Sequence, residues 1–159
     1  MTTQTNRRRF IRSSAIAGCT IIAAGKLTAF SFPQDEVPDP KKLNYCGYTC
    51  PKDCQFLEAS VKNDSELKMK AYETWKIKER YNIDFDAEKI FCFGCKNTED
   101  PAGVVMLNCT VRQCAIGKNL DACIECNNLK ICDKDLWSRF PEFHQSVIKM
   151  QASYEESKS

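Results

Sequence analysis

Histidine is almost absent from this chain, and its scarcity limits the chemistry that the chain can perform. His144 is the single histidine among 159 residues. A zinc site would therefore need thiolate ligands alone or nearly alone, and mechanisms that rely on a histidine base or on histidine metal ligands are close to excluded. The sequence also lacks paired carboxylates, a phosphate-binding glycine loop or a hydrolase nucleophile motif that stands out from chance. A hydrolase or a nucleotide-dependent enzyme is therefore not expected.

The net charge is small and unevenly distributed. The chain has 23 Lys and Arg residues and 21 Asp and Glu residues, for a formal charge of +2. Five of the basic residues lie in the first 31 positions, so residues 32–159 hold 18 basic and 21 acidic residues, a net charge of −3. A body with this balance lacks the basic surface that a phosphate backbone attracts. Nucleic acid is therefore not an expected partner.

A long hydrophobic run is also missing, although residues 1–31 are organised like a leader. The stretch Arg7-Arg8-Arg9-Phe10-Ile11-Arg12 precedes a mildly apolar run over residues 15–25. That run is too short and too rich in Ala and Gly for a stable membrane span. The leader resembles a twin-arginine export signal, in which two arginines, any residue, Phe, an aliphatic residue and a basic residue follow one another.

This resemblance implies that the twin-arginine (Tat) machinery exports the folded protein to the periplasm or another extracytoplasmic space. We expect cleavage after Ser31 or after Ala29, where small residues stand at the required places. A lipid anchor on Cys19 is the alternative, because Ile16-Ala17-Gly18-Cys19 has the form of a lipoprotein box, but the apolar run before it is short. Cleavage at Ser31 or Ala29 removes Cys19 and leaves ten cysteines and no stable membrane span.

Cysteine is the residue that the chain has in excess, with eleven in 159 residues. Seven of them form two C-x2-C pairs, one C-x4-C pair and a last single thiol, which are Cys92/Cys95, Cys123/Cys126, Cys109/Cys114 and Cys132. A turn that holds a C-x2-C pair aims two thiolates at one point, and a second pair from a distant segment completes a four-sulfur shell. The two pairs therefore indicate a metal or iron–sulfur site.

Three further thiols, Cys46, Cys50 and Cys54, recur with the spacing C-x3-C-x3-C. Gly47 and Pro51 favour a wrapped loop over a continuous helix, with Pro51 at the first turn of a helix that runs to about Val61. All ten cysteines after the leader are expected metal ligands, and they suffice for two four-thiolate sites. We expect this loop to share one site with one of the C-x2-C pairs, and the remaining pairs to form the other.

Helical patterns dominate the rest of the chain. Residues 64–81 predict the clearest helix, with Asn63 as its cap, Glu66 as the return partner of that cap, and an apolar stripe at Leu67, Ala71 and Trp75. Further helices are expected over residues 109–118, 133–139 and 141–154, and a short strand is expected over 104–107. We therefore expect a mostly α fold, a small cysteine-rich helical domain with irregular loops stapled by metal, cluster or disulfides, with little or no sheet. This domain covers residues 45–154, between a linker at 32–44 and a tail at 155–159.

The order of these motifs resembles a cysteine-rich family known as domain of unknown function 3795. The matching groups are Cys46-Gly47 with Cys50 and Cys54, then Cys92-Phe93-Gly94-Cys95, then Cys109 with Cys114-Ala115, then Cys123, Cys126 and Cys132. The resemblance covers roughly residues 45–145. The family has no established activity, so it implies the domain and leaves the chemistry to the residues.

Three kinds of function remain open at this point. The first is binding of zinc or a 4Fe–4S cluster, with electron transfer as a role if a cluster is bound. Export in the folded form favours a cluster inserted in the cytoplasm, whereas the lack of a tight C-x2-C-x2-C run favours zinc. The second is a periplasmic domain stapled by disulfides without metal. The third is a dithiol redox protein, although no thioredoxin-like βαβ pattern surrounds either C-x2-C pair.

Overall fold

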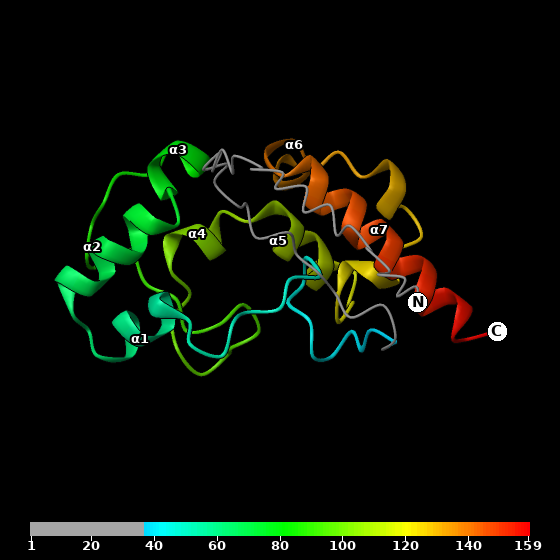
Figure 1. Ribbon diagram of the computed structural model, residues 1–159, viewed down its shortest axis with the longest axis horizontal. Coiled ribbons are helices and arrows are strands. Elements are labelled where there is room, and N and C mark those ends of the chain that lie inside the picture. Colours follow the sequence, from blue (N-terminus) through cyan, green and yellow to red (C-terminus); the bar gives the residue numbers. More distant parts are fainter. Residues whose placement is uncertain (1–36) are drawn as a thin grey trace, which may run out of the picture. The chain divides into compact units, whose positions relative to one another are not determined.

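The structure, a computed structural model, describes residues 37–159, which belong to one compact unit that spans Phe32–Ser159 (Figure 1). The expected export signal, its cleavage positions and Cys19 lie outside the described residues, as do the first five residues of the expected linker.

Helices are the regular elements of the described residues, which contain no strand. Seven α-helices and two 3-10 turns follow one another in the order α1 (Gln55–Val61), α2 (Ser65–Thr74), α3 (Ile77–Tyr81), α4 (Val104–Leu107), α5 (Thr110–Gly117), η1 (Cys123–Glu125), η2 (Leu129–Ile131), α6 (Asp135–Arg139) and α7 (Pro141–Glu156). The expectation of a mostly α, cysteine-rich domain without a sheet is confirmed.

Two hydrophobic clusters form the core. The first contains Ile77 and Ile90, which are 1% and 0% exposed, and packs against residues of α1, α2 and α4. The second contains Ile124, Leu129 and Val147 and joins η1 and η2 to α5, α6 and α7. Figure 1 shows α1 to α4 in green shades on one side of this unit and α6 and α7 in orange and red on the other. Thiols belong to both clusters, so the cysteines lie within the packing and not only on surface loops.

The single helix expected over residues 64–81 is wrong in two respects. Asp64, not Asn63, caps α2, because its carboxylate accepts the N–H groups of Glu66 and Leu67 at 2.9 and 3.0 Å. The helix is also interrupted at Lys76, whose φ of 51° lies in the left-handed region. This break separates α2 from α3, and Ile77, which follows it, is buried in the first cluster.

The segment Val104–Leu107 forms a short helix and not a strand. The N–H groups of Met106 and Leu107 both donate to the Gly103 carbonyl, which closes a helical turn. A four-residue apolar run has no periodicity that separates the two structures. The first helix also begins later than expected, at Gln55 after Cys54, which leaves Pro51 in the preceding loop.

The C-terminal helices are confirmed. Pro141 stands at the first turn of α7, where its missing N–H leaves no hydrogen bond unmade. Leu136 and Val147 are buried in the second cluster, and Phe140 and Phe143 pack against it. Within residues 37–159, no helix has both the length and the apolar character that a membrane span requires.

Gly47 generates the first prediction, because both its backbone and its surroundings require glycine. Its φ is +89°, and a Cβ atom at this position would lie 2.9 Å from Val147 Cγ1. We expect Gly47→Ala to lower the free energy of unfolding by roughly 3 kcal/mol, since a left-handed φ costs about 1–2 kcal/mol and overpacking about 1–3 kcal/mol. Urea denaturation measures the change.

Gly117→Ala is the matched control. Gly117 is helical, and nothing lies within 4 Å of a Cβ added there. This variant should be unchanged or more stable by up to about 1 kcal/mol, the difference between Gly and Ala in a helix. Equal unfolding free energies for the two variants would show that the close contact of Gly47 with α7 is not needed.

Candidate metal centre

The ten cysteines of the described residues are free thiols, and they fall into two neighbouring groups. Four of them line one cavity and are called the cavity thiols here: Cys114, Cys123, Cys126 and Cys132. The other six are called the loop thiols: Cys46, Cys50, Cys54, Cys92, Cys95 and Cys109. Burial, and in addition neighbouring members of this group, raise the pKa values of Cys46, Cys50, Cys92 and Cys95. The chain therefore brings its thiols together from segments up to 86 positions apart, since Cys46 and Cys132 bound the set.

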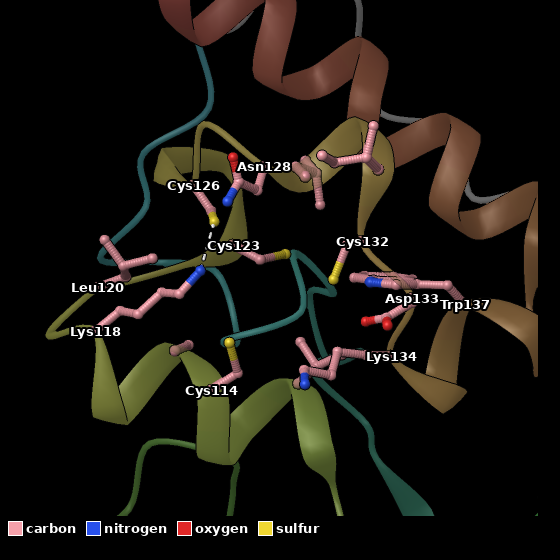
Figure 2. A pocket seen from close by; sticks show the side chains of 14 residues that line it. Cys114, Lys118, Leu120, Cys123, Cys126, Asn128, Cys132, Asp133, Lys134 and Trp137 are labelled. Carbon is pink, nitrogen blue, oxygen red and sulfur yellow. Dashed lines mark hydrogen bonds between the residues drawn. The ribbon is translucent and has the colours of Figure 1, made fainter.

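The cavity has a volume of about 340 Å³ and opens to solvent. Figure 2 shows the four sulfur atoms around a common space, with Cys114 on one side and Cys123, Cys126 and Cys132 on the other. Apolar side chains complete much of the wall, including Val111, Leu129 and Trp137. Among the described residues, no three His, Cys, Asp or Glu side chains form a group suited to a single metal ion. The cavity thiols surround a volume instead of meeting at one point.

Tight turns place three of the cavity thiols. The Cys126 N–H donates to the Cys123 carbonyl at 3.0 Å and so closes the turn around the C-x2-C pair. The Leu129 N–H then donates to the Cys126 carbonyl, and the Cys132 N–H donates to the Leu129 carbonyl at 3.2 Å. Each turn begins where the previous one ends, so the pair and Cys132 reach one side of the cavity. Cys114 faces them from α5 (Figure 2).

Helix α7 holds the C-x2-C turn through one buried amide. Gln151 is 2% exposed, and its side-chain N–H groups donate to the carbonyls of Ile124 and Cys126, each at 2.9 Å. Glu125, a residue of this turn, makes further hydrogen bonds that support it. Its carboxylate accepts the Asp121 N–H at 2.7 Å and the Tyr154 hydroxyl at 3.2 Å. The turn is thus fixed by side chains of α7 as well as by its own backbone.

Trp137 brings an unpaired polar atom to the cavity. Trp137 is 4% exposed and lines the cavity, and its indole Nε1–H has no hydrogen-bond partner among residues 37–159. Figure 2 shows this nitrogen on the edge of the ring that faces Cys132. His144 stacks on the ring at a centroid distance of 4.5 Å, and its Nε2 lies 2.9 Å from the Leu129 carbonyl oxygen. The single histidine thus has a structural partner, and the buried indole N–H lacks one.

Lys118 is a cationic side chain that lines the cavity and contacts one of its thiols. Its Nζ lies 3.4 Å from Cys126 Sγ, a contact drawn as a dashed line in Figure 2. This hydrogen bond, together with the nearby Cys126, Cys114 and Cys132 thiols, raises the pKa of the Lys118 ammonium. The cavity therefore has a positive charge fixed beside one of its sulfur atoms.

The loop thiols are held by hydrogen bonds from several segments. The Asn44 side chain donates to Cys50 Sγ at 3.3 Å. The Cys92 N–H donates to the Ser60 hydroxyl at 2.8 Å, and the Arg112 guanidinium donates to the Cys95 carbonyl at 3.2 Å. These bonds connect the first cysteine loop, α1 and α5 around one region.

Burial keeps several of these thiols neutral. It raises the pKa of Cys46 to about 12 and that of Cys92 to about 11, and neighbouring thiols add to both shifts. Burial also raises the pKa of Cys123 well above its usual range, and Cys46 and Cys132 contribute. Thiolates at these positions need positive charge to compensate them, and a bound metal would supply it with release of protons.

The sequence anticipated the grouping in part. The loop with Cys46, Cys50 and Cys54 lies with the C-x2-C pair Cys92/Cys95, and the other pair lies with Cys114. The C-x4-C pair is divided between the groups: Cys109 directly precedes the first residue of α5 and lies with the loop thiols, whereas Cys114 lies on α5 and lines the cavity. Lys118 and Trp137 were not anticipated. Lys118 stands four residues after Cys114, a spacing that brings two side chains to the same face of a helix. This spacing is the sequence signal that could have indicated a lysine near the thiols.

Residues 37–159 thus form a small, helical, cysteine-rich unit, and this described part of the chain has ten free thiols, four of them around one cavity. The chain belongs to the family described as protein of unknown function (DUF3795), which it matches over residues 42–136. That match includes all ten cysteines of the two groups. No curated protein and no solved structure matches the chain.

The role of Gln151 gives the second prediction. Gln151→Leu has nearly the same volume but removes both side-chain donors, so the Ile124 carbonyl loses its partner while the Cys126 carbonyl keeps the Leu129 N–H. We expect the free energy of unfolding to fall by roughly 1–3 kcal/mol, because a buried acceptor left unpaired costs about that much. Urea denaturation of the protein as purified measures this.

Gln113→Leu is the control for this change. Gln113 is exposed, although its side chain also donates to a carbonyl, that of Leu107 at 2.7 Å. Water replaces that donor, so the loss should stay within about 0.5 kcal/mol. A Gln151→Leu variant as stable as this control would mean that the turn does not depend on α7.

Proposed function

We propose that the cavity thiols bind a 4Fe–4S cluster and that the protein is an exported electron carrier. The observation that carries this proposal is the arrangement of four thiols around a cavity of about 340 Å³. A 4Fe–4S cluster takes four cysteine thiolates, one on each iron, so its ligands surround a volume. Cys114, Cys123, Cys126 and Cys132 would be these ligands.

The unpaired indole N–H of Trp137 supports the same assignment. Buried donors are almost always hydrogen-bonded, and one that lines a cavity points to an acceptor within it. The sulfur atoms of a cluster and its thiolates accept such bonds, and hydrogen bonds to sulfur are one of the features that set cluster potentials. Trp137, 4% exposed and stacked on His144, is held rigidly enough to supply one.

Zinc is the alternative occupant. A structural zinc site brings four sulfur atoms to about 2.3 Å from one ion, which requires the thiols to converge. The cavity thiols lie around an open space, which supports the larger group. Disulfides remain a further alternative, because the cavity places four thiols near one another and the expected compartment is oxidising.

Electron transfer is the activity that this site would support. A bound cluster would accept and donate single electrons. The chain's own residues hold the four thiols through the backbone turns and Gln151, and Val111, Leu129 and Trp137 keep much of the wall apolar. The cavity stays open on the side of Lys118, where a redox partner can approach.

Export is the second part of the proposal, and the leader supports it. Arg7, Arg8, Phe10, Ile11 and Arg12 match the twin-arginine pattern place by place. Transport in the folded state permits a cluster to be inserted before export, and it keeps ten thiols from mispairing in an oxidising space. The proposed location is therefore the periplasm or another extracytoplasmic space.

The third prediction concerns the occupant. Protein purified without air or chelator should be brown, with a broad visible absorption band and about four iron and four acid-labile sulfide per cavity. Cys123→Ser and Cys126→Ser should each lose this iron and melt at a lower temperature, because ligand loss removes binding energy that stabilises the fold.

Cys50→Ser is the control, since Cys50 is exposed and lies among the loop thiols. It should keep the iron of the cavity. Colourless protein with zinc in place of iron would reject the cluster. Protein without metal and without titratable thiols would indicate disulfides. Full metal content in both Cys123→Ser and Cys126→Ser would exclude the cavity as the site.

The fourth prediction tests export. Replacement of both Arg7 and Arg8 by Lys should hold the precursor in the cytoplasm, because the twin-arginine pattern requires this pair. Cell fractionation followed by immunoblotting measures the distribution. Arg9→Lys is the matched control, since the pattern accepts any residue there, and it should export normally. Export of the double variant at the normal level would reject the assignment of the leader.

A further inference from the structure

Lys118 is attached by its backbone to the helix that carries one cavity thiol. It follows Gly117, the last residue of α5, and its N–H donates to the carbonyls of Cys114 and Ala115 at 3.1 and 3.2 Å. The position of the Lys118 main chain is therefore fixed relative to Cys114.

The Lys118 side chain reaches a second cavity thiol. Its Nζ lies 3.4 Å from Cys126 Sγ, and Figure 2 shows the extended side chain running along one side of the cavity toward that sulfur. Cys126 belongs to the C-x2-C turn that Gln151 anchors to α7. The residue thus connects α5 to the C-x2-C turn through a donor aimed at sulfur.

The Lys118–Cys126 contact is the one place in the described residues where a charged side chain is hydrogen-bonded to a cavity sulfur. Asp133 and Lys134 also line the cavity, but neither has such a bond in the described part of the chain. Lys118 and Cys126 also line a shallower depression beside the cavity, together with Asn127 and Asn128. The ammonium therefore lies on the wall between the cavity and solvent.

We infer that Lys118 is a positioning residue that donates a charge-assisted hydrogen bond to Cys126 and raises the reduction potential of the cluster. This inference rests on the proposed function. A four-thiolate cluster gains one negative charge when it accepts an electron, and an adjacent ammonium stabilises the more negative state. Net charge and hydrogen bonds to sulfur are the features by which a protein tunes such a potential.

The experiment is a reductive titration of the anaerobic full-length protein. Lys118→Met keeps the length of the side chain and removes its charge and donor. This substitution should shift the equilibrium between oxidised and reduced cluster about tenfold toward the oxidised state. The reduction potential should therefore decrease by about 59 mV for a one-electron couple, with iron and sulfide content unchanged. Lys118→Arg keeps the charge and should restore most of the potential.

Lys134→Met is the matched control, because Lys134 lines the same cavity without a bond to sulfur in the described structure. It should shift the potential less than Lys118→Met does. High salt should shrink the difference between the Lys118→Met variant and the unaltered protein, since Lys118 is exposed and ions screen its charge. A merely structural role would produce no such salt dependence.

Two results would overturn the inference, and they differ from each other. An iron-loaded Lys118→Met protein with the potential of the unaltered protein would reject the role of Lys118 and leave the cluster in place. Unaltered protein that contains no iron would reject the proposed function, and the role of Lys118 with it. A shift of equal size in Lys134→Met would assign the effect to general charge and reject the specific hydrogen bond.

Discussion

The hydrogen bond from the Cys123 N–H to the Tyr45 carbonyl, 2.7 Å long, fixes the relation between the two thiol groups. Tyr45 directly precedes Cys46, so this bond places the first cysteine of the loop thiols beside the first cysteine of the C-x2-C turn. Lys96 and Arg112 lie over the Tyr45 ring, with 5.6 and 5.9 Å between the charged group and the ring centroid. Segments around positions 45, 96, 112 and 123 therefore meet at one residue, and the arrangement of the thiols depends on that junction.

The energetics of the thiols explain why so small a helical unit needs them. Except for α7, the α-helices of the described residues are only four to ten residues long. Isolated helices of that length are marginally stable in water. Buried neutral thiols pack as small hydrophobic groups, and Cys54 and Cys123 serve this role in the two clusters. The same burial opposes thiolate formation, as the raised pKa values of Cys46 and Cys92 indicate. A metal that binds thiolates would therefore add its binding energy directly to the stability of the fold.

The sequence predicted the class of fold and most helices. Its predictions were wrong where one backbone angle ends a helix, and incomplete where a contact depends on residues distant in the sequence. Helical propensity runs without a break from Asp64 to Tyr81, and nothing in it marks the left-handed conformation of Lys76 that ends α2. The spacing of the cysteines predicted that they gather, because tight pairs favour convergence. It did not place Cys109 and Cys114 in different groups, since that depends on where α5 begins relative to both. The sequence alone did not assign Trp137 and Lys118 to the site, because only the folded structure places them at the cavity beside Cys132 and Cys126.

The division of the thiols into six and four has a consequence for how the two groups behave together. Charge on Cys95 or Cys109 raises the pKa of Cys46 in the same group, and charge on Cys46 raises the pKa of Cys123 in the cavity. Negative charge in one group therefore disfavours negative charge in the other. A 4Fe–4S cluster bound by four thiolates has a net negative charge, so occupation of the cavity would make the loop thiols harder to ionise and would disfavour a second four-thiolate group there. The junction at Tyr45 would then connect the chemistry of the two groups as well as their positions.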